Sequence, residues 1–217
     1  MFTATFERPT LIDSQAGLRS LFKSDSVYLH SGARVVFDGE TILGCGVTLS
    51  GDCRFYGPTR IDNGSILENV SFGRDNVVRA YSLLSDVAAG DRNMFGPFCF
   101  IRDNCRIADD CILGAHVETA RSNFGTRVKV SHRAFVGDAE IARDTIIGAG
   151  VVFCNFDGSG RQNTRIGPGV TIGSGSLLIP PLVIGENSII AAGSTVTKNV
   201  AAGTTLIQKR ETHAGPK

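Results

Sequence analysis

The sequence predicts an all-β fold, a parallel β-helix (hexapeptide repeat), from three observations. Apolar residues return every six positions through most of the chain, and a small or β-branched residue follows four positions after each of them. Glycine occurs 26 times in 217 residues, and tryptophan is absent. No stretch shows a sustained helical period. Together these features favour short strands separated by frequent turns.

The repeat is clearest in FGPFCF, IRDNCR, IADDCI and LGAHVE, which begin at Phe95. The first position is nearly always Leu, Ile, Val or Phe, and we expect it to point inward together with the fifth position. Three hexads would close one triangular coil of about 18 residues, so the stretch from Leu43 to about Ala201 has room for about nine coils. A β-sandwich would alternate with period two, which fits this pattern worse.

The two ends of the chain lack the hexads. We expect residues 1–40 to cap the open end of a β-helix domain at 41–201, because an uncovered end would expose unpaired strand edges. Within the cap, LIDSQAGLRSLF predicts a short helix with Asp13 or Ser14 as its N-cap. Residues 202–217 are expected to form a polar C-terminal tail.

Composition narrows the class of protein and its compartment. A net charge of +1 with 20% charged residues disfavours a strongly basic nucleic-acid surface. No window approaches 18 uninterrupted apolar residues, so we expect no membrane partner. The N-terminus MFTATFERPTLIDSQ does not resemble a secretory signal, and we therefore expect a cytoplasmic protein with reduced cysteines.

Four of the six cysteines fall on the fifth, small position of the hexad: Cys53, Cys99, Cys105 and Cys111. There a cysteine behaves as a small buried hydrophobe. The alternative is a metal site, but thiols six residues apart lie on different faces of a coil and cannot converge on one ion.

His132 is the histidine of interest. It is the third residue of the hexad VSHRAF and should point outward. Counting one coil in each direction places it between Ala115 and Ala149, with glycines close by. On this pattern alone it is either a solvated side chain or a proton acceptor. Nearby, the stretch FCNFDGSGRQNTRIG replaces a hexad with a polar loop, which could form the wall of a site.

Several arginines lie within two coils of His132 in sequence, and the ones singled out here indicate either a solvated basic face or an anion site for a phosphate or coenzyme A. They are Arg102, Arg121, Arg127, Arg133 and Arg161. His116 also points outward, and we expect a surface or wall role for it. A zinc site of the hexapeptide-repeat carbonic anhydrase type needs three histidines, whereas this region has only two.

The segments GPFCFIR, HVETAR, VSHRAFVGDAEI, IGAGVVFCNFDG and IIAAGSTVTKNV resemble a known family. They are similar to the acetyltransferase domain of the bifunctional glucosamine-1-phosphate acetyltransferase / N-acetylglucosamine-1-phosphate uridyltransferase. The resemblance covers residues 95–201, and no uridyltransferase domain accompanies it. It implies a left-handed β-helix, a homotrimer with sites between subunits, and acetyl-CoA as co-substrate without a metal.

Carried over residue by residue, the resemblance implies that His132 is the general base, that Glu118 helps to orient it, and that the N–H of Ala149 meets the acetyl carbonyl. On the coenzyme A side it implies contacts from Asn155, Phe156, Ser174, Ala192 and Lys209. On the sugar side it implies binding by Arg102, with Arg121, Phe135 and Arg161 nearby. The sugar side departs from the family at four positions: Ala120, Phe135, Ile146 and Arg161.

The expected function is therefore an acetyl-CoA-dependent N-acetyltransferase. Its acceptor would be a small molecule, an amino sugar in the form of a sugar phosphate resembling glucosamine-1-phosphate or a nucleotide-linked amino sugar. The alternatives are an O-acetyltransferase with the same base and donor, and a non-catalytic β-helix scaffold.

Overall fold

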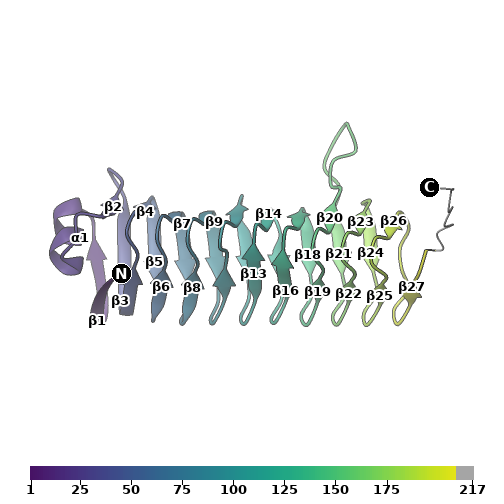
Figure 1. Cartoon of the computed structure of the whole chain (residues 1–217), viewed down its shortest axis with the longest axis horizontal. Coiled ribbons are helices and arrows are strands. Elements are labelled where there is room, and N and C mark those ends of the chain that lie inside the picture. Colours follow the sequence, from purple (N-terminus) through teal and green to yellow (C-terminus); the bar gives the residue numbers. More distant parts are fainter. Residues whose placement is uncertain (209–217) are drawn as a thin grey trace, which may run out of the picture.

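The computed structural model describes residues 1–208, and in them the chain forms a rod of stacked triangular coils (Figure 1). The expected β-helix is confirmed: almost every strand pairs in parallel with the strand one coil away. Lys209, predicted as a coenzyme A contact, and most of the predicted tail lie outside the described residues.

Each coil contributes to three faces. The first face stacks the end of β3 (Arg34–Leu43) under β6 (Thr59–Ile61), β8 (Asn76–Val78), β10 (Met94–Phe95), β13 (Ile112–Ala115), β16 (Lys129–His132), β19 (Ile146–Ile147), β22 (Thr171–Ile172), β25 (Ile189–Ile190) and β27 (Thr205–Leu206).

The second face stacks β2 (Val27–Leu29), β4 (Val47–Ser50), the starts of β7 (Ile66–Phe72) and β9 (Leu83–Ala89), β11 (Phe100–Arg102), β14 (Glu118–Ala120), β17 (Phe135–Gly137), β20 (Val152–Phe153), β23 (Leu177–Leu178) and β26 (Thr195–Val196). The third face stacks the start of β3, β5 (Asp52–Phe55), the ends of β7 and β9, β12 (Cys105–Ile107), β15 (Asn123–Phe124), β18 (Ala139–Ile141), β21 (Thr164–Ile166) and β24 (Leu182–Ile184).

The core is the single column enclosed by these faces. The two inward positions of the hexad are buried throughout, as the sequence predicts, including the four cysteines on the fifth position. Phenylalanines form part of the column: Phe37, Phe55, Phe72 and Phe95 pack ring to ring with centroids 5.4–5.7 Å apart. Such uninterrupted apolar stacking is what holds one coil on the next.

The N-terminal end is covered, and the cap contains an element that the hexad pattern does not reveal. Strand β1 (Phe2–Ile12) pairs antiparallel with β3, and α1 (Gln15–Phe22) follows with Ser14 as its N-cap. Phe22 packs against Phe37 at 5.5 Å and closes the core. The parallel stacking runs from Val27 to Leu206, beyond both boundaries of the predicted β-helix domain at 41 and 201.

Most corners of the coils carry a residue with positive φ. The corner between the first and second faces, here the first corner, carries Gly64, Tyr81, Phe98, His116, Arg133, Gly150, Gly175 and Gly193. The corner between the second and third faces, here the second corner, carries Asn69, Asp86, Asp103, Arg121 and Asp138. Because consecutive coils superimpose, residues 17 or 18 apart in sequence become direct neighbours at a corner.

Candidate active site

His132 is an exposed residue at the end of β16, immediately before the first corner. It pairs with Ala115 of the preceding coil, and its carbonyl accepts a hydrogen bond from the N–H of Gly150 at 3.2 Å. That bond sets the register that places Ala149 on the other side. The predicted position of His132 between two alanines is therefore confirmed. These small neighbours leave the faces of its imidazole ring open to a ligand.

The first corner places a ladder of rings beside His132. Tyr81 stacks on Phe98 with centroids 5.6 Å apart, and Phe98 stacks on His116 at 5.2 Å, both at an interplanar angle of 7°. Arg133 occupies the next level, and glycines occupy the levels after it. The ladder thus ends at the coil of His132, and beyond it the corner is bare backbone.

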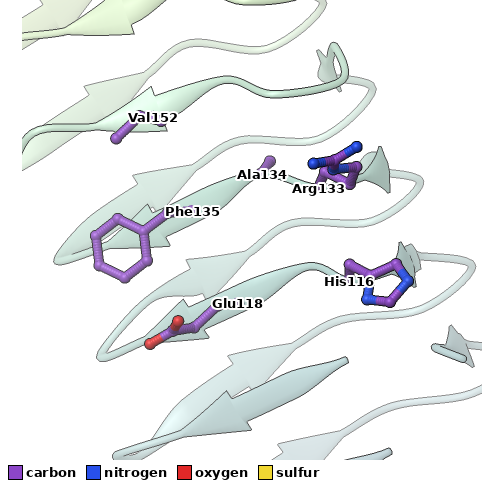
Figure 2. A pocket seen from close by; sticks show the side chains of 6 residues that line it. All are labelled: His116, Glu118, Arg133, Ala134, Phe135 and Val152. Atoms are coloured by element: carbon purple, nitrogen blue, oxygen red, sulfur yellow. The ribbon is translucent and has the colours of Figure 1, made fainter. Parts of the chain in front are cut away.

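An open groove of about 570 Å³ lies on the second face next to this corner. Figure 2 shows Glu118, Phe135 and Val152 on successive coils, with His116 and Arg133 at the turn. His116 forms part of the wall, as its outward position predicts. His132 does not itself line the groove but directly precedes two residues that do, Arg133 and Ala134.

The far edge of the second face holds Asn155. This residue is buried, and its Nδ2 donates to Oδ2 of Asp138 at 2.5 Å. Asp138 also accepts two hydrogen bonds from Arg121, at 2.7 Å from Nε and 3.2 Å from Nη2. Burial raises the pKa of the Asp138 carboxyl, but the hydrogen bonds from Arg121 and Asn155 lower it, and the net shift is downward.

This arrangement fixes which way the amide of Asn155 faces. An ionised carboxylate only accepts hydrogen bonds, so the NH₂ group of Asn155 must be the part that faces Asp138. The Oδ1 of Asn155 is then the atom left to accept a hydrogen bond from a ligand.

Glu118 and Arg102 contact each other. Nη2 of Arg102 donates to Oε1 of Glu118 at 2.8 Å, and the guanidinium carbon of Arg102 lies 5.2 Å from the ring centre of Phe100. Within residues 1–208, Glu118 therefore pairs with Arg102 and makes no hydrogen bond with His132. Arg102 also donates to Asp103.

The loop after β20 projects from the rod between β20 and β21 (Figure 1). Phe156 is 64% exposed at its start and forms an isolated antiparallel bridge with Arg161. Asp157 accepts hydrogen bonds from the backbone of Ser159 and Gly160, which lower the pKa of its carboxyl. The loop is therefore an ordered hairpin held by its own polar groups.

On the C-terminal side of His132, small residues continue the same column. Ala149 accepts from the N–H of Gly175 at 2.8 Å, and Ser174 accepts from the N–H of Gly193 at 2.7 Å, which stacks Ala149, Ser174 and Ala192 on successive coils. All three are exposed. A shallow strip of small side chains and backbone thus leads from His132 towards the C-terminal end.

Within residues 1–208, no group of three or more histidine, cysteine or carboxylate residues is placed to hold a metal ion. No helix in this range is long and apolar enough to cross a membrane.

The stacked hexads define the chain as a hexapeptide-repeat β-helix, and residues 163–198 match the family model described as Bacterial transferase hexapeptide (six repeats). The chain is 34% identical over 181 residues to the Bifunctional protein GlmU of Baumannia cicadellinicola, which covers 83% of this chain and 37% of that protein. It is 38% identical over 165 residues to the protein of the same name from Alkalilimnicola ehrlichii, covering 76% and 33%.

The chain therefore spans only about a third of the length of these curated relatives, and the resemblance found in the sequence is confirmed for that part. Among solved structures, a polySia specific acetyltransferase named NeuO is 18% identical, with 82% of this chain and 81% of that chain covered and a TM-score of 0.35. UDP-N-acetylglucosamine acyltransferase from Campylobacter jejuni is 13% identical, with 82% and 68% covered and a TM-score of 0.31. TM-scores this low do not establish a shared activity.

Sequence reasoning missed three residues that shape the site. Asp103 and Asp138 bind the arginines of the second corner, and Val152 lines the groove. A signal for the two aspartates was present: Asp103, Arg121 and Asp138 are spaced by 18 and 17 residues, the length of one coil.

Proposed function

We propose that the chain is an acetyl-CoA-dependent N-acetyltransferase that acts on the amine of an amino sugar. The observation that carries this proposal is the meeting of three features at one corner: an outward histidine, small neighbours that leave room beside it, and a groove of ligand size. The likeness to the curated relatives over most of this chain supports the same activity.

In this proposal His132 is the general base. The amine nitrogen attacks the carbonyl carbon of the acetyl thioester, and the imidazole takes the proton that the nitrogen loses. The carbon–sulfur bond then breaks, and the coenzyme A thiolate takes this proton from the imidazolium and leaves as the thiol, which returns His132 to its neutral form. The N–H of Ala149 would donate to the carbonyl oxygen as negative charge develops there. Glu118 would help to orient the histidine once both substrates and a neighbouring subunit are in place.

The coenzyme would follow the strip formed by Ala149, Ser174 and Ala192, because small side chains let an extended ligand approach the backbone. Asn155 would accept from the reacting amine or from an amide N–H of the coenzyme through its free Oδ1. Phe156 offers an exposed aromatic surface at the base of the projecting loop. Lys209 remains a proposed coenzyme contact.

The acceptor would occupy the groove on the second face. Phe135 gives it an apolar floor, while Arg102, Arg121 and Arg161 supply polar groups at its far side. The resemblance suggests a sugar phosphate or a nucleotide-linked amino sugar, and both belong in the test beside the free amino sugars.

A homotrimer with sites between subunits fits the surface of the rod. The first and second faces expose apolar side chains on both sides of the His132 corner, among them Ile146 at 46%, Ile189 at 49% and Leu177 at 39%. Burying these side chains against other copies of the chain would remove them from water and close the open groove.

The test is thiol release from acetyl-CoA with a panel of free amino sugars, their 1-phosphates and their nucleotide-linked forms. We expect release with at least one amino sugar and a product that survives hydroxylamine, as an amide does. A hydroxylamine-labile ester would instead identify an O-acetyltransferase. No release with any acceptor, together with no rise in melting temperature at millimolar acetyl-CoA, would identify a scaffold.

A further inference from the structure

Two arginines beside the groove are bound to the same carboxylate. Nη1 of Arg102 and Nη1 of Arg121 each donate to Oδ2 of Asp103 at 2.5 Å. The remaining bonds also go to carboxylates: Arg102 donates to Glu118, and Arg121 donates twice to Asp138. Asp103 is therefore a bridge between the two guanidinium groups that the sequence offers as an anion site.

The charge around the two arginines is not positive. Three carboxylates face these two guanidinium groups, and the positive charge of Arg161 also acts on Asp138, so the cluster carries no excess of positive charge. All three nitrogens of Arg121 are engaged, and Arg102 keeps only its Nε free of a carboxylate. A phosphate would have to break these bonds before it could accept from either side chain, and it would meet the carboxylates as like charges.

The place of Asp103 in the coil explains why one residue controls both arginines. It stands at the second corner with a φ of +60°, directly after Arg102 in sequence and one coil below Arg121. Both side chains are half-buried there, with exposed fractions of 29% for Arg102 and 28% for Arg121, so their guanidinium groups have few other positions to adopt.

We propose that Asp103 is a specificity-determining residue that closes the Arg102–Arg121 end of the groove to anionic groups. The acceptor is then an amino sugar that places uncharged hydroxyl groups at this end. A hydroxyl both donates to a carboxylate and accepts from a guanidinium, so it fits the mixed cluster without breaking it. This inference rests on the proposed acetyl transfer for the identity of the acceptor, but not for the behaviour of the anion site.

The first test measures anion binding and needs no activity. Inorganic phosphate is titrated against the wild-type chain and Asp103→Asn, with the melting temperature as the readout. Asparagine keeps the shape of aspartate and tolerates positive φ. We expect the substitution to tighten phosphate binding by about 10- to 100-fold, the gain from freeing charge-assisted hydrogen bonds. Asp103→Ser is the second variant if Asp103→Asn fails to fold.

Asp110→Asn is the matched control, because it removes one carboxylate from an arginine pair, with Arg92 at 2.7 Å, at another corner of the coil. It should leave phosphate binding unchanged. Tight phosphate binding by the wild-type chain, or equal weak binding by the wild-type chain and Asp103→Asn, would overturn the role of Asp103.

The second test uses turnover. For an amino sugar and its 1-phosphate, Asp103→Asn should raise the ratio of kcat/KM in favour of the phosphorylated form by at least about tenfold. If no acceptor is acetylated by any variant, the proposed function fails while the phosphate titration still decides the role of Asp103. A wild-type preference for the 1-phosphate would contradict the inference and leave the proposed function standing.

Discussion

The ring ladder at the first corner makes an unusual prediction about Phe98. This residue has a φ of +57° and is 50% exposed, and it stacks on Tyr81 at 5.6 Å and on His116 at 5.2 Å. Each stacked pair contributes about 0.5–1.5 kcal/mol, so removal of the ring should cost about 1–3 kcal/mol. The left-handed conformation costs a residue with a Cβ about 1 kcal/mol or more, and glycine avoids that cost.

Phe98→Ala loses the stacking and keeps the strained backbone, whereas Phe98→Gly loses the stacking and relieves the strain. We therefore expect the glycine variant to be the more stable of the two by about 1 kcal/mol, which corresponds to roughly 2–4 °C in melting temperature. Circular dichroism melts of both variants measure this difference directly.

Phe100 provides the control, since it is an exposed phenylalanine at the start of β11, where the backbone is extended. There the order should reverse, with Phe100→Gly less stable than Phe100→Ala by about 0.5–1 kcal/mol. A glycine variant at position 98 that melts below the alanine variant would refute the argument that the corner is strained.

Three further predictions concern charge, thiols and the co-substrate. Asp138→Asn should lower the melting temperature at pH 7. Because the folded-state pKa of Asp138 is depressed, the difference in melting temperature from wild type should vanish as the pH falls through that pKa. Equal differences at pH 7 and at low pH would contradict this. Burial raises the pKa of the Cys99 and Cys111 thiols to about 11, so iodoacetamide at pH 8 should label exposed Cys45 first and these two only in denaturant, as mass spectrometry would show. Acetyl-CoA at about 100 times its dissociation constant should stabilise the chain by about 2.7 kcal/mol, visible as a rise in melting temperature of several degrees, and an unchanged melt would argue against a coenzyme site.

The sequence predicts the β-helix and the surroundings of His132 well for one physical reason. A coil of nearly constant length converts sequence distance into contact, so Ala115 and Ala149 could be placed beside His132 by counting. The same rule accounts for the burial of every fifth-position cysteine. Where the hexad is regular, no tertiary information is needed.

The six-residue repeat predicts less where contacts depend on which charged side chains pair between coils. It also predicts less where the hexad is absent. Arginines near His132 suggested an anion site because positive charges were considered without the carboxylates one coil away. The structure pairs Arg102 and Arg121 with Asp103 and Asp138, which changes the electrostatics of the acceptor end. Strand β1 was not foreseen because its antiparallel pairing with β3 leaves no six-residue period.

The central claim is that His132 moves a proton during acetyl transfer, and its most direct test is the rate of thiol release by His132→Ala. The variant should bind acetyl-CoA and melt as the wild-type chain does, yet turn over at least about 100-fold more slowly with the best amino sugar acceptor. His30→Ala, at an exposed histidine directly after β2 and near the N-terminal end of the rod, should turn over at the wild-type rate. Turnover by His132→Ala within a few-fold of wild type would contradict the account.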